Sequence, residues 1–483
     1  MMIKKINKTQ IIYTAVVCVL MAFSACKAPG LVGREVNLKD LPQNYAKGTA
    51  DTTNTALIKW KGYFTDPYLT KLIDSALVNN QELNIMLQEI AVSKSEIRAK
   101  KGEYLPFLGF GASAETEKVG RYTSQGANDA NTDIKEGVEF PEPLPNYQFG
   151  LQATWELDIW KKLRNAKKAA VFNYLSSVEG RNFMVTQLVG EIAESYYELM
   201  ALDNQLAIVN RNIEIQGNAY RIVRLQKEAA RATGLAVSKF EAEVLHTKSL
   251  QFDIQQKIVE AENRINFLVG RFPQHVDRSS QDLLQLVPKM ILAGVPAQLL
   301  ENRTDVKQAE LALEAAKLNV QVAKARFYPS IGISAGVGFE AFNPKFLLDS
   351  PESLLYSIAG ELTAPLINRN EIKAVYASAN AKQIQAVYDY ERTVLNAYIE
   401  VANQLAKVDN LSKSVALKAQ EVDALNRSVN ISSQLFSSAR ADYMEVLMTQ
   451  RDALESNFEL VETKMDQMNA YVHMYQALGG GWN

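Results

Sequence analysis

The chain has 483 residues, of which 47% are hydrophobic and 22% are charged, and its formal net charge is −2. This composition is typical of a folded protein, and the near-neutral charge gives no argument for nucleic-acid binding or for a polybasic membrane patch. A chain of this length usually forms about two to four domains, but an internal duplication indicates two similar halves of one architecture.

The N-terminus has the pattern of a secretion signal. Three lysines within the first eight residues precede the apolar stretch 11–23, which is too short to span a bilayer comfortably. Small residues then lead to Cys26, as in a lipobox, although Phe23 stands where leucine is usual. Because Cys18 leaves with the signal, the mature chain has one cysteine and cannot form an internal disulfide. We expect a lipoprotein signal peptide over 1–25 and a covalent lipid on Cys26; an ordinary cleaved signal is the alternative.

Residues 26–65 show little periodicity and are expected to form an extended N-terminal arm. Asp66 then precedes Pro67, the pattern of a helix N-cap followed by proline in the first turn. Apolar residues at helical spacing continue to about Lys101 and predict one or two amphipathic helices, which Pro106 ends.

Two strands with one apolar and one polar face come next. Residues alternate with period two at about 106–118 and again at about 146–158. The Gly-, Asn- and Pro-rich segment between them, 119–145, is expected to be an exposed loop. The second strand runs without a linker into a heptad pattern that lacks proline as far as Phe272, which predicts a long helical hairpin over 161–270.

The same order of elements returns after an irregular connector at 276–300. We therefore divide the chain into a first repeat, 66–275, and a second repeat, 301–483. The repeated elements are a helix that ends at Pro329, strands at about 330–340 and 354–366, and a helical hairpin over 368–478.

The four strands have the length and alternation of transmembrane β-strands, and their polar faces carry small residues that suit a water-filled lumen. A soluble sandwich is the alternative for the strands taken alone. Four strands cannot close a barrel and lipid does not tolerate open edges, so several copies must pool their strands. The residues expected to face lipid are Leu108, Phe110, Phe149, Leu151, Trp155, Ile333, Val337, Ile358 and Leu362.

The helices have a heptad core stripe but are too polar elsewhere to span lipid, so they must lie in aqueous space. These demands together predict an α+β membrane protein. Its outer-membrane β-barrel, with four strands per chain, is continued by a periplasmic coiled-coil barrel of long helices, with an irregular equatorial region.

Four segments of the chain carry motifs of a known family. They are Tyr475–Trp482 at the C-terminus, Arg303–Val306 together with Tyr328-Pro329, Trp155–Asp158 at the strand-to-helix junction, and Tyr443–Leu447 before Gln450-Arg451. From about Trp60 onward the chain resembles the outer-membrane factor family, the exit ducts of tripartite efflux pumps and of type I secretion. The lipoprotein branch linked to resistance–nodulation–division pumps looks nearest.

The resemblance implies a passive outer-membrane duct that conducts drugs or other small molecules. It implies a homotrimer with twelve strands and twelve helices, inserted in outer-membrane lipid and extending into the periplasm. It also implies a periplasmic adaptor and an inner-membrane resistance–nodulation–division transporter as partners. Type I protein secretion is the alternative within this class, and a coiled-coil lipoprotein without a channel is the alternative outside it.

No chemical motif predicts an enzyme. Gly332–Gly336 matches G-x-S-x-G, but Ser334 lies inside a two-faced strand rather than at a strand-to-helix elbow. His246, His275 and His473 share no metal-ligand spacing. We expect no catalytic residue, no metal and no cofactor other than the lipid on Cys26, and no nucleic acid as a partner.

The helical tips are the expected site of closure, because the barrel lumen is lined by small residues. Related ducts commonly have Asp three residues before the arginine of Gln-Arg, where this chain has Met448; Met444 lies one helical turn earlier on the same face. If that face points inward, three copies form an apolar gate, with Glu445 only a partial substitute for an acidic ring. The alternative is that both methionines pack between helices.

The tip residues expected to contact the adaptor are Arg231, Thr233, Gly234, Arg440 and Asp442.

Overall fold

The computed structural model describes residues 28–36, 42, 45, 54–279, 282–288, 292–438 and 440–482. The expected signal peptide and Cys26 lie outside these residues. None of the described helices combines the length and apolarity that a membrane crossing requires.

The chain forms two compact units. The first, called the sheet unit, contains Val92–Tyr174 and Leu311–Val387 with the described part of Met1–Glu35. The second, called the helical unit, contains Leu175–Glu310 and Tyr388–Asn483 with Val36–Ala91.

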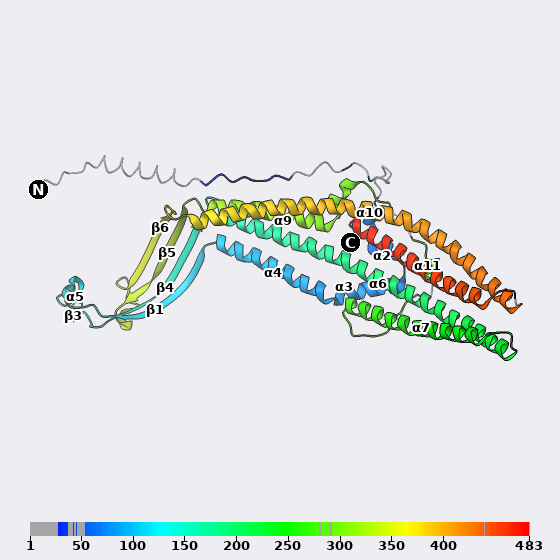
Figure 1. Ribbon diagram of the computed structural model, residues 1–483. Coiled ribbons are helices and arrows are strands. Elements are labelled where there is room, and N and C mark those ends of the chain that lie inside the picture. The colour runs from blue at the N-terminus through cyan, green and yellow to red at the C-terminus, as the bar shows by residue number, and fades with distance from the viewer. Residues whose placement is uncertain are drawn as a thin grey trace. The chain divides into compact units, whose positions relative to one another are not determined.

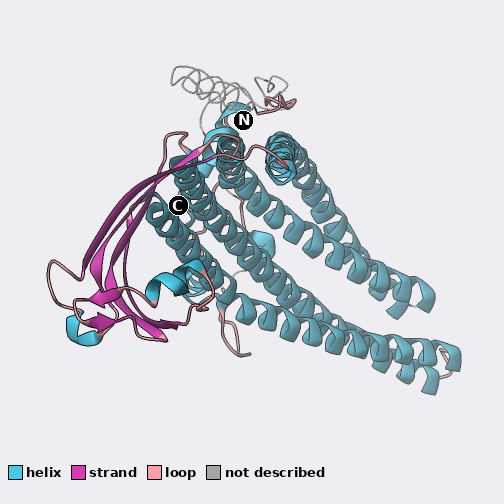
Figure 2. Cartoon of the chain, turned by 90° about the vertical axis from the view of Figure 1, so that its left-hand side faces the viewer, coloured by secondary structure: helices cyan, strands magenta, loops and turns pink. Residues whose placement is uncertain are grey.

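Four antiparallel strands make the main sheet of the sheet unit, in the order β1-β4-β5-β6 (Figures 1 and 2). Strand β4 of the first repeat pairs with β5 of the second, so one sheet joins the two halves of the chain. Within the described residues no further strand pairs with β1 or β6, and both edges are open. The strands are β1 (Phe107–Glu117), β4 (Leu144–Leu157), β5 (Ser330–Ala341) and β6 (Leu354–Thr363).

Two expectations for this unit were wrong in detail. The last strand ends at Thr363 rather than at about 366, because Pro365 has no N–H to donate to a strand ladder. The segment 119–145 is more than an open loop, since it contains local structure built around a tight turn at Gly137, whose φ is 76°. That local structure is helix α5 (Ser124–Asp129) and the hairpin β2 (Asp133–Lys135) and β3 (Val138–Glu139).

Two long hairpins, α6–α7 and α10–α11, supply most of the helical structure (Figure 1). Helix α6 runs for 67 residues without a break, because it contains no proline and keeps a heptad core. The long helices are α6 (Lys162–Glu228), α7 (Gly234–Val269), α10 (Asn370–Ser437) and α11 (Tyr443–Ala477). The remaining helices are η1 (Thr55–Leu57), α2 (Trp60–Tyr63), α3 (Pro67–Asn79), α4 (Gln81–Tyr104), η2 (Leu283–Gln285), η3 (Pro296–Gln298), α8 (Leu299–Asn302), α9 (Thr304–Ala325) and η4 (Pro344–Phe346).

Side-chain caps fix several helix starts. Asp66 accepts hydrogen bonds from the N–H groups of Tyr68 and Leu69 at the start of α3, as the sequence predicts. Thr233 caps α7 in the same way, and Gly234 is the first residue of that helix. The turn between α6 and α7 contains Ala230, whose backbone is left-handed with φ 55°.

Three hydrophobic clusters of the helical unit hold the hairpins together, and one of them joins α8, α9, α10 and α11 around Val306, Val394 and Met474. The main cluster joins α3, α6, α7 and α11 around buried heptad residues such as Ile192 and Leu199. The tip cluster is separate from it and consists of Val223, Ala236, Val237, Phe240, Val446 and Leu447, with Ala219, Tyr220, Ala232, Phe436 and Tyr443 packed against it.

Candidate functional site

The sheet register places all nine residues that the sequence predicts to face lipid on one face. Directly opposed residues of an antiparallel sheet project to the same side. The opposed pairs include Phe110 with Leu151, Leu151 with Val337, and Trp155 with Ile333. Leu108 pairs with Ala153, Phe149 with Phe339, Ile358 with Ala335, and Leu362 with Ile331, so these residues share that apolar face.

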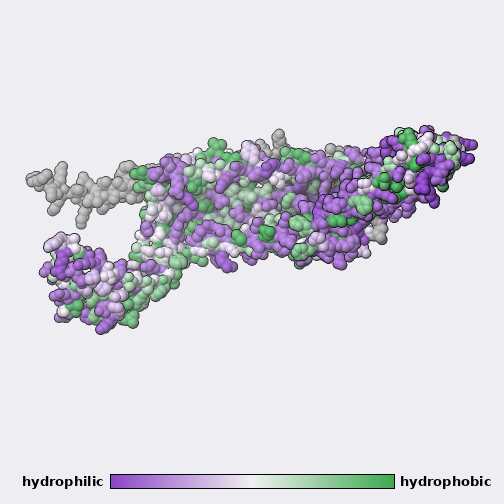
Figure 3. Space-filling view, turned by 60° about the horizontal axis from the view of Figure 1, so that its bottom comes forward, coloured by the Kyte–Doolittle hydropathy of each residue, from purple (hydrophilic) through white to green (hydrophobic). Residues whose placement is uncertain are grey.

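The apolar face is open to its surroundings in a single copy. Phe110 is 70% exposed, Ile358 81% and Leu362 67%. Hydrophobic surface gathers over the strands in Figure 3. A contiguous exposed apolar patch of this kind marks a surface that meets lipid or another protein.

The opposite face of the sheet carries mainly small residues and is negatively charged. The four strands contain five glutamates and no lysine or arginine, and all five glutamates lie on this polar face. Glycines on this face let the backbones of neighbouring strands approach each other closely: a β-carbon on Gly150 of β4 would lie 2.6 Å from the carbonyl oxygen of Val337 on β5. The face therefore offers an acidic surface to water. The glutamates are Glu115, Glu117, Glu156, Glu340 and Glu361.

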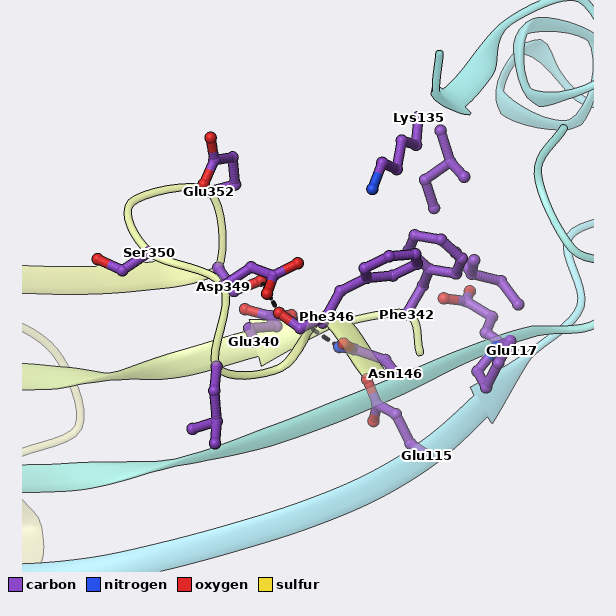
Figure 4. A pocket seen from close by; sticks show the side chains of 16 residues that line it. Glu115, Glu117, Lys135, Asn146, Glu340, Phe342, Phe346, Asp349, Ser350 and Glu352 are labelled. Atoms are coloured by element: carbon purple, nitrogen blue, oxygen red, sulfur yellow. Dashed lines mark hydrogen bonds between the residues drawn. The ribbon is translucent and has the colours of Figure 1, made fainter. Parts of the chain in front are cut away.

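A cavity of about 870 Å³ opens where the polar face meets the loops (Figure 4). Glu115 and Glu340 reach it from β1 and β5, and Asn146 donates a hydrogen bond of 2.7 Å to Glu340. The ammonium of Lys135, on β2, lies 4.0 Å from the ring centre of Phe346. Sequence analysis missed this contact, because nothing in the pattern of the loops joins residues so far apart.

The strand-to-helix junction is fixed by Asp158. Its carboxylate accepts hydrogen bonds from the N–H of Leu163 at 3.0 Å and of Arg164 at 2.9 Å. Burial opposes ionisation of Asp158, but these hydrogen bonds and the Arg164 guanidinium hold its pKa below the usual value. Lys161 and Asn368 take left-handed backbone conformations at equivalent junctions of the two repeats, with φ 59° and 53°. The motif Trp155–Asp158 thus sets the direction in which α6 leaves the sheet.

The side chain of Arg303 connects two other sequence motifs, one around Arg303 itself and one at the C-terminal end of the chain. Its buried guanidinium pairs with Asp305 at 2.7 Å and Glu400 at 2.6 Å, and donates to the carbonyl oxygen of Ala477 at 3.0 Å. Burial alone would lower the pKa of Arg303, but the two carboxylates raise it. The segment Arg303–Val306 and the C-terminal Tyr475–Trp482 are therefore parts of one structural clamp.

The tip residues that the sequence singles out lie at the surface. Met444 is 39% exposed and Met448 is 50% exposed, and Glu445 is also exposed. Their neighbours Val446 and Leu447 instead enter the tip cluster. The methionines are thus not packed between helices of their own chain. The expected adaptor-contacting residues, Arg231, Thr233, Gly234, Arg440 and Asp442, are exposed as well.

Ser334 and the three histidines, which sequence motifs alone could assign to catalysis or metal binding, lie in ordinary strand, helix and loop positions. Ser334 lies in the middle of β5 and pairs with Thr154 and Ala359, so it is not at an elbow. His275 contacts Glu262 at 2.9 Å and His473 contacts Glu194 at 2.6 Å, and His246 lies on α7. Within the part of the chain that the structure describes, no group of side chains could hold a metal ion.

The family model named outer membrane efflux protein matches residues 72–271 and 295–480. The chain belongs to the outer membrane efflux protein family. The match covers both repeats and confirms the predicted duplication and fold class. This outer membrane efflux protein is therefore a channel component located in the outer membrane, and not an enzyme.

Named relatives extend the comparison. The solvent efflux pump outer membrane protein SrpC of Pseudomonas putida is 27% identical over 438 residues, 90% of each chain. The cation efflux system protein CusC of Escherichia coli O6:H1 is 26% identical over 472 residues, 96% of this chain and 98% of the relative. A crystal structure of CusC superposes with a TM-score of 0.81 at 23% identity, over 93% of this chain and 100% of that chain.

Proposed function

We propose that three copies of this outer membrane efflux protein pool their sheets into one twelve-stranded barrel. The observation that carries the proposal is the two-faced sheet with open edges at β1 and β6. Unpaired strand edges are not tolerated in lipid, so the edges of neighbouring copies must pair. The exposed apolar face then meets lipid and the acidic face lines a water-filled lumen.

The long hairpins continue this lumen as a periplasmic tube of twelve helices. Their heptad cores suit lateral packing into a coiled-coil barrel. Small molecules pass through passively, since the sheet offers a lining and not a catalytic site. The strands of each chain carry five glutamates and no lysine or arginine. Lys162 at the start of α6 pairs with Glu156, and the remaining negative charge favours cationic and neutral cargo over anions.

The exposed tips are the proposed docking surface for a periplasmic adaptor protein, through which the channel couples to an inner-membrane resistance–nodulation–division transporter. Relatives named as components of solvent and cation efflux systems support this assignment. The exposed tip arginines Arg231 and Arg440 are available to a partner.

Conductance across planar bilayers tests the channel. The purified protein should run as a trimer and insert as cation-selective pores. A trimer that never conducts, even after removal of side chains at the tips, would identify a coiled-coil lipoprotein without a channel. A conducting monomer would contradict the pooled barrel.

A further inference from the structure

The hydrophobic core of the hairpins is interrupted near the tips. The main cluster and the tip cluster share no residue, although both involve α6, α7 and α11. The interval between them covers 214–218 on α6, 241–249 on α7 and 448–457 on α11. The buried apolar residues inside this interval are Val244, Ala453 and Leu454, and they belong to neither cluster.

Buried polar side chains occupy this interval. Gln216 and Thr247 are 0% exposed and Gln450 is 2% exposed. None of their side-chain polar atoms has a hydrogen-bond partner among the described residues. Gln216 stands midway between Val209 and Val223, which are seven residues away on either side and fully buried, so it takes a core position of the heptad.

The three side chains lie at one level of the antiparallel helices. Gln205 of α6 donates to Glu462 of α11 at 3.3 Å, and Gln216 and Gln450 lie eleven and twelve residues closer to the tip. Gln251 of α7 likewise donates to Asn210 of α6 at 2.7 Å, a few residues from the level of Thr247 and Gln216. We call Gln216, Thr247 and Gln450 the polar layer.

Helix α6 is also weakened at this level by Gly217. A β-carbon at Gly217 would meet nothing within 4 Å, so packing does not require a glycine there. The other glycines of α6 are different: a β-carbon on Gly180 would lie 2.7 Å from Gln308, and one on Gly190 would overlap Gln476. A glycine inside a helix lowers its stability relative to alanine. Gly217 therefore loosens the helix without a gain in packing.

We propose that the polar layer is a hinge at which the ends of the hairpins bend away from the rest of the helical unit. Each buried amide without a partner destabilises the closed layer, and bending that admits water satisfies it. The tip cluster keeps the end segments together, so they move as one body. This inference goes beyond the proposed function, because it states where the helices bend and does not depend on which molecule the channel conducts.

Hydrogen exchange measured by mass spectrometry on the intact detergent-solubilised protein tests the hinge directly. Backbone amides at 212–220 should exchange about tenfold faster than those at 198–209 and also faster than those at 221–226. Protection that is uniform, or that falls steadily toward the tip, would overturn the proposal. The readout does not depend on transport, so it stays independent of the proposed channel activity.

Variants of the polar layer provide a second test of the hinge. Gln216→Leu combined with Gln450→Leu should raise the melting temperature and slow exchange at 212–220, and Gly217→Ala should slow it by about fivefold. Gln205→Leu is the matched control, because Gln205 is buried on the same helix but has a partner, and it should leave that segment unchanged. If the double variant fails to fold, Gly217→Ala still tests the hinge. Its β-carbon would meet nothing within 4 Å, so this variant should fold. Unchanged exchange in Gly217→Ala would contradict the hinge.

Discussion

Gly270 and Gly479 are structural equivalents in the two repeats. Each follows the end of a long hairpin helix with a left-handed backbone, at φ 77° and 91°. Each also faces the backbone carbonyl of an asparagine at the junction of two shorter helices, Asn79 and Asn302. The duplication therefore extends to a backbone contact, in which glycine is needed both for its conformation and for its lack of a β-carbon.

Alanine at either glycine should destabilise the helical unit. The left-handed backbone alone costs an alanine about 1–2 kcal/mol, and a β-carbon at 479 would lie 2.7 Å from the oxygen of Asn302. Thermal unfolding in detergent, followed by circular dichroism, measures the loss. Gly102→Ala on α4 is the control, because its β-carbon meets nothing within 4 Å, and it should be neutral or stabilising by up to about 1 kcal/mol. Similar behaviour of all three variants would contradict the assigned contacts.

The two faces of the sheet should differ in their tolerance of charge. Leu151→Arg should destabilise the barrel by about 2–4 kcal/mol if Leu151 lies near the bilayer midplane. Gln152→Arg, one residue along β4, projects from the polar face and should be tolerated. Heat stability of the trimer on gels and its yield in outer membranes measure both. Equal damage from the two variants would show that the faces are assigned wrongly.

The methionine face of α11 should control the resting current. Met444→Ser combined with Met448→Ser removes apolar side chains that are exposed in a single chain, so water should enter a constriction formed by three copies. The closed-state conductance in planar bilayers should rise clearly. Val446→Ser is a contrast, because Val446 is buried in the tip cluster and its loss should lower stability first. A closed state that the double methionine variant leaves unchanged would place the gate elsewhere.

Lys464 should make stability depend on pH. It is buried on α11, donates to Gln467 at 3.0 Å, and has no carboxylate in ion-pair distance among the described residues. Burial lowers its pKa, so the unfolded chain binds this proton more tightly than the native protein. The resulting loss of stability is complete below the native pKa and disappears as pH rises toward the unfolded value of about 10.4.

Lys464→Met should therefore stabilise the protein at neutral pH, by about 1 kcal/mol or more, with a gain that shrinks in alkaline solution. Chemical denaturation at several pH values measures it. Lys418→Met is the control, because Lys418 pairs with Glu459 at the surface and should change stability by less than about 1 kcal/mol. Destabilisation by Lys464→Met at neutral pH would mean that this charge has a partner in the assembly.

Cys26 should be the acylated first residue of the mature protein. The charged, apolar and small-residue series before it motivates this expectation. Mass spectrometry of protein from outer membranes should find a lipid-modified N-terminal peptide that begins at residue 26. One acyl chain anchors weakly, so Cys26→Ser should lose the lipid and still be retained through its strands. An unmodified N-terminus at another residue would disprove the assignment.

The sequence by itself determined the two-faced strands, the heptad helices and the duplication. These features are periodic, and a period of two or of seven residues is visible locally without knowledge of the partner. The apolar alternation over Phe149–Trp155 is one example, and the structure places those residues on one face of the sheet. The family motifs were recognisable for the same reason, since each is a short continuous segment.

Only the tertiary structure decided which segments meet. Residues far apart in the chain meet in three places. Strand β4 pairs with β5 across the two repeats. Arg303 donates a hydrogen bond to the carbonyl oxygen of Ala477 at the end of α11, and Lys135 contacts the ring of Phe346. The polar layer was hidden in the same way, because Gln216 fits a helix as well as its neighbours do. The layer becomes visible only when three helices bring their polar side chains to one buried level, where none of these side chains has a hydrogen-bond partner among the described residues.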